Sequence, residues 1–217
     1  MSDPEANKIQ ETIAHPVVIA DALGADIWQP SSRQQQEGQR YERGEAIRFL
    51  GQTPSIICHA TYLVERLGSG KNTNKKAIQQ ARDTRHFDVC ELFAFVVPGV
   101  TTTPTPDGLA KALDIPPQIS QIETLKSVVA ALVGRLSSPR YPHIRETAEI
   151  ANFLKRGKWP WADVVLQALA ASTPDLKLND FITGLELGNA GANSLDNTRA
   201  FVTEDDGEGA AQNAVGD

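Results

Sequence analysis

Apolar and polar positions along the chain predict a strand-rich first third and an entirely helical second half. Short β-branched runs bounded by Gly, Pro or polar residues indicate strands, and apolar residues three and four positions apart indicate helices. The expected strands lie at residues 16–20, 25–28, 55–58 and 87–89. The expected helices lie at residues 41–50, 59–67, 75–82, 90–97, 106–113, 120–136, 142–156 and 161–170.

Two of these predictions rest on specific local signals. The first two strands flank a Leu-Gly turn, which predicts a β-hairpin, and a polar loop is expected at residues 30–40. In the helix at 120–136, Ser120 and Glu123 form the capping-box pattern, and apolar residues then follow one face for four turns.

The order of these elements is that of an α/β core with a helical extension. We expect three segments: a flexible polar leader at residues 1–14, the α/β domain with its extension at 15–172, and a weakly structured acidic tail at 173–217.

The charge balance narrows the possible partners. The chain has 21 Lys and Arg against 27 Asp and Glu, a net charge of −6. Residues 188–217 contain six acids and a single Arg, which leaves a net charge of −1 for residues 1–187. A nearly neutral body argues against a strongly cationic nucleic-acid binder, because such proteins cluster Lys and Arg. Weak or partner-assisted contact with nucleic acid remains open.

Composition also bears on the compartment. No stretch reaches the roughly 18 consecutive apolar residues of a transmembrane helix, and residues 1–12 lack the apolar core of a signal peptide. Cys58 and Cys90 are the only cysteines, too few for a disulfide framework. We therefore expect a cytoplasmic protein without membrane contact.

A phosphate-binding loop is suggested by residues 68–71 (GSGK). However, Glu65 stands where the Walker pattern needs Gly, and Asn72 stands where it needs Ser or Thr. The segment also follows a predicted helix, whereas a phosphate loop leaves a strand. We interpret it as a surface loop.

Four residues, Cys58, His59, His86 and Cys90, are of types that ligate zinc. Cys58 and His59 are adjacent and point apart if they lie on a strand. We therefore expect buried cysteines and ordinary histidines here, with neither a zinc site nor a Cys-His nucleophile.

The best nucleic-acid candidate is the aromatic and basic cluster at residues 153–161 (FLKRGKWPW). Aromatic faces stack on bases and nearby cations contact phosphates. The candidate contact residues are Lys155, Arg156, Lys158, Trp159 and Trp161. The other interpretation is a tryptophan corner that pins two helices together with its lysines facing water.

Three blocks of the chain, SIICHATYLVERL, RHFDVCELFAFVVPG and TPTPDGLAKALDIPP, carry a resemblance to known proteins. They resemble the RNase H-like exonuclease superfamily of DEDD type and, more closely, the amino-terminal region of DinG-type ATP-dependent DNA helicases. Residues 56–67, 88–99 and 106–116 match the superfamily's successive strand and helix motifs, and the resemblance covers roughly residues 16–170. It implies a degenerate RNase H-like exonuclease core.

Four carboxylates in this superfamily bind two divalent cations, which activate water and stabilise the leaving oxygen. Asp21 matches the first position of the Asp-x-Glu motif, but Leu23 replaces the glutamate, and Val64 stands where a further acid belongs. The final His-x4-Asp motif could only be sought at His143, whose fifth successor is Ala148. Asp88 matches an Asp that caps a helix in the family and is not a metal ligand.

The resemblance therefore implies a fold that has lost its catalytic centre, with Asp21 and His59 as relics of the metal site. The Walker loop, the iron–sulfur cysteines and the DEAH-like box of the helicase motor are missing from the sequence. We expect a non-catalytic accessory domain of a DNA helicase or DNA-repair system, with no cofactor, which contacts single-stranded DNA, a helicase motor subunit or another partner protein.

Two other hypotheses remain open. One is an active 3'-5' exonuclease that needs Mg or Mn, in which Asp21, Asp26 or Glu149 form an atypical site. The other is an interaction module unrelated to helicases, whose acidic tail binds basic partners.

Overall fold

The computed structural model describes residues 15–30, 38–69 and 74–172. Five strands form one mixed sheet in the order β3-β2-β1-β4-β5. The strands are β1 (Val17–Ala20), β2 (Gly24–Trp28), β3 (Gln39–Glu42), β4 (Ile56–Ile57) and β5 (Phe87–Asp88). Strand β2 runs antiparallel to β1 and β3, whereas β1, β4 and β5 run parallel.

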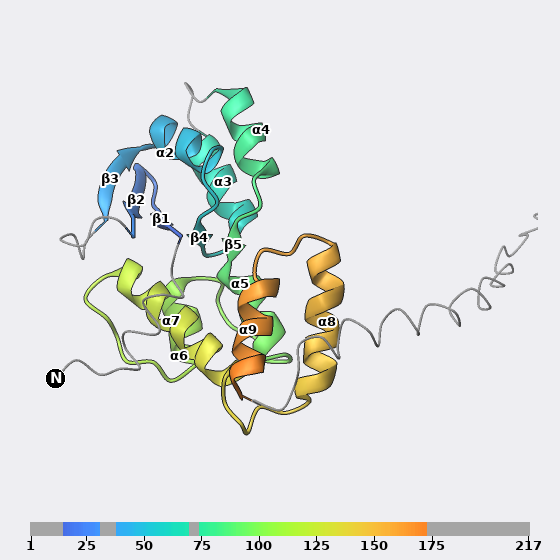
Figure 1. Cartoon of the computed structure of the whole chain (residues 1–217). Coiled ribbons are helices and arrows are strands. Elements are labelled where there is room, and N and C mark those ends of the chain that lie inside the picture. Colours follow the sequence, from blue (N-terminus) through green and yellow to red (C-terminus); the bar gives the residue numbers. More distant parts are fainter. Residues whose placement is uncertain (1–14, 31–37, 70–73, 173–217) are drawn as a thin grey trace, which may run out of the picture.

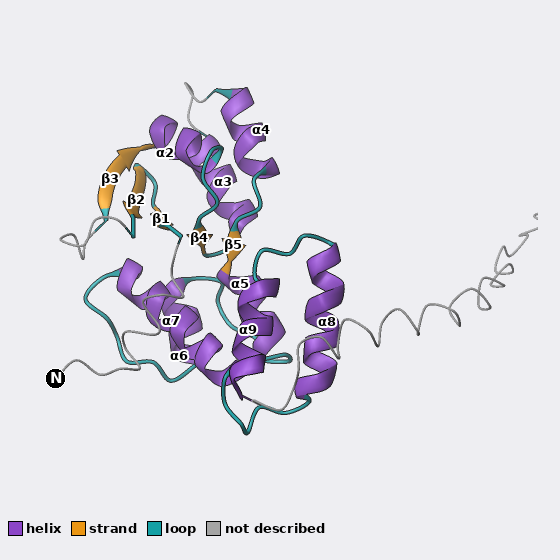
Figure 2. Cartoon of the chain, viewed as in Figure 1, coloured by secondary structure: helices purple, strands orange, loops and turns teal. Residues whose placement is uncertain are grey.

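Eight helices accompany the sheet in the described part of the chain (Figure 2). They are α2 (Arg43–Leu50), α3 (Ala60–Gly68), α4 (Lys75–Asp83), α5 (Val89–Val96), α6 (Pro106–Ala112), α7 (Gln121–Leu136), α8 (Ile144–Arg156) and α9 (Ala162–Ser172). The protein is thus a mixed α/β protein whose last five helices follow the last strand of the sheet, as the hydrophobic pattern predicts.

The sheet lies between two layers of helices (Figure 1). Its central strands β1 and β4 are buried on both faces. Side chains alternate along a strand. Val18 and Ile57 accordingly face one hydrophobic cluster with α2, α3 and α4. Val17 and Ile56 face a second cluster with α5, α7 and α9. Strands buried on both faces read as continuous apolar runs, which is why residues 17–19 and 56–57 show no alternation.

The predicted β-hairpin is confirmed, because β1 and β2 pair antiparallel from Val17 with Trp28 to Ala20 with Ala25. The strands predicted at 55–58 and 87–89 are present as the short parallel strands β4 and β5. Asp88 ends β5 and accepts a hydrogen bond from the Cys90 amide at the start of α5, so strand and helix follow each other without a loop.

The helix predicted at residues 41–50 is shorter than expected. It begins at Arg43, and residues 39–42 form the edge strand β3 instead. This strand was not predicted because Tyr41 is its only apolar residue and its other three residues are exposed. An edge strand needs little apolar character, since one of its sides faces solvent.

The remaining helices agree with the sequence pattern to within two residues at each end. Ser120 caps α7, its hydroxyl accepting a hydrogen bond from the Glu123 amide at 3.2 Å. Thr105 caps α6 in the same way, with Pro106 at the first helical position. The predicted leader at 1–14 and tail at 173–217 lie outside the described residues. No helix in the described ranges combines the length and apolar character needed to cross a bilayer.

Candidate functional site

Asp88 is a buried carboxylate at the carboxyl end of the parallel strands β4 and β5. It is 7% exposed. One of its oxygens accepts hydrogen bonds from the His59 amide (3.0 Å) and the Cys90 amide (2.9 Å), and the other accepts from the Ala60 amide (2.6 Å). Asp88 therefore caps α3 and α5 at once. The resemblance assigns it a capping role without a metal, and these contacts agree with that role.

His59 lies at the same end of the sheet, directly before α3. Its backbone is in the left-handed region, with φ of 61°, which turns the chain from β4 into the helix. The imidazole ring lies 5.8 Å from the Tyr62 ring, centroid to centroid. Its backbone amide, bound to Asp88, has a clear structural role in starting α3.

Asp21 follows the last residue of β1 and organises the β1–β2 turn. Its Oδ1 accepts hydrogen bonds from the amides of Leu23 (2.7 Å) and Gly24 (3.0 Å) and from the Arg40 guanidinium (2.6 Å). Arg40 and the two amides hold the pKa of Asp21 well below its usual range. Arg43 also donates to the Ala22 carbonyl, so two arginines hold this turn.

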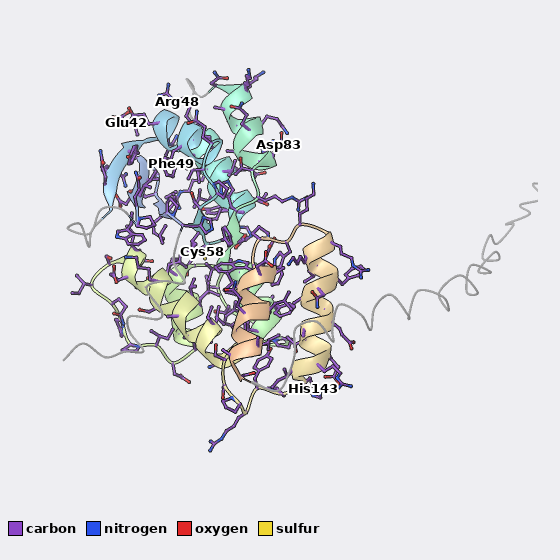
Figure 3. The ribbon with its side chains drawn as sticks, in the orientation of Figure 1. Glu42, Arg48, Phe49, Cys58, Asp83 and His143 are labelled. Carbon is purple, nitrogen blue, oxygen red and sulfur yellow. The ribbon has the colours of Figure 1, made fainter. Side chains whose placement is uncertain are left out.

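The other positions expected for metal ligands do not converge on Asp21. Leu23, in place of the glutamate, is 80% exposed in the turn, and Val64 is buried against the sheet in α3. His143 lies at the end of α8 that is remote from the sheet (Figure 3). Within the described ranges, no group of three or more His, Cys, Asp or Glu side chains could hold a metal ion.

The four residues considered as a zinc set do not form a ligand group in the described part of the chain. Cys58 Sγ lies 3.5 Å from Cys90 Sγ. The buried His86 ring instead accepts from the Ser55 amide at Nδ1 (3.3 Å) and contacts the Ala81 carbonyl through Nε2 (3.1 Å). Both ring nitrogens of His86 are therefore occupied. Burial lowers the pKa of His86, which keeps the ring neutral.

The corner between α8 and α9 contains the residues of the aromatic and basic cluster. Trp161 is 2% exposed, its indole N–H donates to the Asp88 carbonyl at 2.8 Å, and its ring packs edge-on against Phe87. A ring at this exposure offers no face to a base. Trp161 therefore attaches the α8–α9 corner to β5, as expected if the tryptophans hold two helices together. We leave it out of the candidate contact surface.

Trp159 is half-buried on the side of α5. Its indole N–H donates to the Glu91 carboxylate at 2.9 Å, and its ring lies 4.9 Å from the Phe95 ring. Desolvation raises the pKa of Glu91, and this hydrogen bond opposes that shift. Trp159 thus joins the α8–α9 corner to α5 and keeps part of its ring at the surface.

Basic side chains surround this corner. Lys155 pairs with Asp163 at 2.7 Å, whereas no described carboxylate forms an ion pair with Arg156 or Lys158. Arg85, far away in sequence, reaches the corner and donates to the Gly157 carbonyl at 3.0 Å. Arg85 is not among the contact residues predicted from the sequence, because no local pattern links residue 85 with residue 157.

An exposed aromatic side chain completes the corner. Phe153 is 68% exposed and lies three residues before Arg156, so both are on one face of α8. We define the corner surface as Arg85, Phe153, Arg156, Lys158 and Trp159. Phe153 was part of the aromatic and basic cluster in the sequence, but its exposure could not be distinguished there from burial in the α8–α9 contact.

The segment interpreted as a surface loop lies only partly in the described ranges. Gly68 ends α3, and Ser69 follows it with its hydroxyl bound to the Arg66 carbonyl. Residues 70–73 lie outside the described part.

Comparisons with known proteins give no family for this chain. No protein-family model matches it, and searches of curated proteins and of solved structures find no significant match.

Proposed function

We propose that this chain is a non-catalytic, RNase H-like exonuclease domain that contacts single-stranded DNA through the corner surface, as an accessory domain in DNA processing by a DinG-type helicase. The observation that carries the proposal is the topology of the sheet, taken together with the residues at the ends of its central strands.

The strand order supports an RNase H-like core. The resemblance to the RNase H-like superfamily implies a sheet of three antiparallel strands followed by two parallel ones, in the order 3-2-1-4-5, with only the second strand reversed. The order β3-β2-β1-β4-β5 and the pairing directions in this chain are the same. Helices cover both faces, as expected when the central strands are apolar on both sides.

The contacts of the acids support a non-catalytic role. Two-cation catalysis needs several carboxylates whose oxygens are free to bind metal. Asp21 is the one acid in a matching ligand position, and its Oδ1 is already bound by Arg40 and by two amides. The resemblance expects a second carboxylate two residues after Asp21, where Leu23 points into solvent.

The corner surface supplies the two kinds of contact that single-stranded DNA requires. Phe153 presents an exposed ring on which a base can stack, and Arg156 lies one turn further along the same face. Arg85 and Lys158 add positive charge beside it. The corner surface has three cationic side chains on a nearly neutral body. We therefore expect weak and strongly salt-dependent binding.

Binding of a labelled single-stranded oligonucleotide at low salt, followed by fluorescence anisotropy, tests this surface. We expect Phe153→Ala combined with Arg156→Glu to weaken binding at least tenfold. The matched control is Ile150→Ala combined with Arg145→Glu, which removes an exposed apolar residue and reverses one positive charge on the same helix. Arg145 lies eleven residues from Arg156, about 16 Å along the helix.

All four substituted side chains are exposed, so both double variants should melt like the wild type. Equal loss of binding in the two variants would show a diffuse charge effect and overturn the assignment of the surface. Undiminished binding by the Phe153 and Arg156 variant would also overturn it. Shortening of the oligonucleotide during the titration would contradict the non-catalytic role.

A further inference from the structure

The two cysteines of the chain, 32 residues apart in sequence, lie next to each other in the fold. Cys58 follows β4 directly and Cys90 is the second residue of α5. Both thiols are free, and their sulfur atoms are 3.5 Å apart. Figure 3 shows Cys58 between the sheet and the helices of the second hydrophobic cluster.

The backbone around both sulfurs is held by common contacts. Strands β4 and β5 pair in parallel, with Ile57 opposite Asp88. Ile57 directly precedes Cys58, and Asp88 lies two residues before Cys90. The Asp88 carboxylate accepts hydrogen bonds from the amide of His59, which follows Cys58, and from the amide of Cys90 itself. The sheet and this carboxylate therefore fix the approach of the two sulfurs.

The two thiols differ in access. Cys58 is 9% exposed, and its contact with Cys90, together with burial, raises the pKa of its thiol. Cys90 is more exposed, so a dissolved oxidant reaches it first. An accessible cysteine beside a second thiol is the arrangement of a redox-sensitive pair.

We propose that Cys58 and Cys90 are a reversible dithiol–disulfide site, with Cys90 as the residue that reacts with peroxide and Cys58 as the residue that resolves it. The Cys90 thiolate attacks one peroxide oxygen, the O–O bond breaks, and Cys90 becomes a sulfenic acid while hydroxide leaves. The Cys58 sulfur then attacks the Cys90 sulfur, an S–S bond forms, and the sulfenic oxygen leaves with the Cys58 proton as water.

The cysteines lose two electrons in total and the peroxide gains them. A disulfide has its sulfur atoms about 2.05 Å apart, so the two sulfurs close about 1.5 Å by side-chain rotation and small backbone shifts. Disulfides in cytoplasmic proteins are usually transient and redox-sensing. The site therefore agrees with the compartment expected from the sequence.

Thiol titration of the purified full chain before and after hydrogen peroxide treatment tests this site. Because the chain has only two cysteines, the count is unambiguous. We expect two free thiols before treatment and none after it, a mass lower by two hydrogen atoms, migration as a monomer on a non-reducing gel, and recovery of both thiols with dithiothreitol. Proteolytic fragments of the oxidised wild type should include one peptide pair that joins residues 58 and 90.

Two variants assign the roles. In Cys58→Ser, peroxide should leave Cys90 as a sulfenic acid that a dimedone probe traps. In Cys90→Ser, Cys58 should keep its thiol under the same treatment. Persistence of both thiols in peroxide-treated wild type, or their loss only through dimers between chains, would overturn the proposal. The fragment map needs no variant, so the test stands even if one serine variant fails to fold.

Discussion

Asp88 determines the local geometry where β4 and β5 end. Three backbone amides from two helices bind its buried carboxylate. Helix N-termini leave amide groups without partners, and a carboxylate placed there satisfies them and interacts favourably with the helix dipole. A single side chain therefore replaces two separate caps and orders the chain around both cysteines.

Asp88→Ala should lower the free energy of unfolding by about 3 kcal/mol, because it leaves three amides without their acceptor. Asp88→Asn should cost less, since its oxygen can still accept from His59 and Cys90. Asn74→Ala is the matched control: it removes an exposed cap with a single hydrogen bond at 2.9 Å and should cost about 1 kcal/mol. Urea unfolding followed by circular dichroism measures all three. Equal costs for the Asp88→Ala and Asn74→Ala variants would contradict the double cap.

His86 should make stability depend on pH. Burial lowers its pKa in the folded protein, so below about pH 6.5 the unfolded chain binds a proton that the folded protein does not. Stability should therefore fall as pH decreases from 6.5, by up to about 1.4 kcal/mol per pH unit for this residue. Burial also lowers the pKa of His15, which adds a loss of the same sign.

Melting temperatures between pH 8 and pH 5 test this dependence. His86→Gln should be less stable at pH 8 and show a shallower decline towards pH 5. His143→Asn, at an exposed position with a left-handed backbone, is the control and should keep the wild-type slope. A wild-type slope in His86→Gln would show that His86 does not cause the pH dependence of stability.

Among the elements, the β-hairpin and the edge strand β3 depend on close backbone approach. A Cβ atom on Gly24 would lie 2.1 Å from the Tyr41 carbonyl oxygen in β3. Only glycine allows β2 and β3 to pair at this position, which explains why the first turn ends in Leu-Gly.

Gly24→Ala should destabilise the protein by about 2 kcal/mol, because β3 must shift to accommodate the added methyl group. Gly134→Ala is the matched control, since Gly134 lies within α7 with open space around it. That substitution should stabilise the protein by up to about 1 kcal/mol through helix propensity. Thermal unfolding of both variants and of the wild type measures these changes in stability. A neutral Gly24→Ala would contradict the pairing of β2 with β3.

Sequence patterns predicted those elements whose signals are local. The strand at Ile56–Ile57 and the helix that Ser120 caps follow from short apolar runs and capping residues. Strand β3 was not predicted, because three of its four residues are polar and its partner β2 lies 12 to 18 residues earlier in the chain. The burial of Trp161 and the approach of Arg85 to Gly157 depend on contacts more than 70 residues apart, which no local pattern encodes.

At the scale of the whole molecule, the sheet provides the framework and the helical extension provides the candidate surface. The strand order agrees with the RNase H-like core that we propose, while Asp21 holds a turn and Asp88 caps two helices. The corner surface lies where the α8–α9 corner contacts Arg85 and α5. Binding without chemistry is the role that we propose for this arrangement.

Degradation of an end-labelled single-stranded DNA in the presence of Mn²⁺ tests this account most directly. The full chain is compared with Asp21→Ala on a denaturing gel, with an active exonuclease as positive control and a melting curve to show that both samples are folded. We expect full-length DNA with both proteins. Shortening by the wild type that disappears in Asp21→Ala would establish a working nuclease and contradict the proposed non-catalytic role.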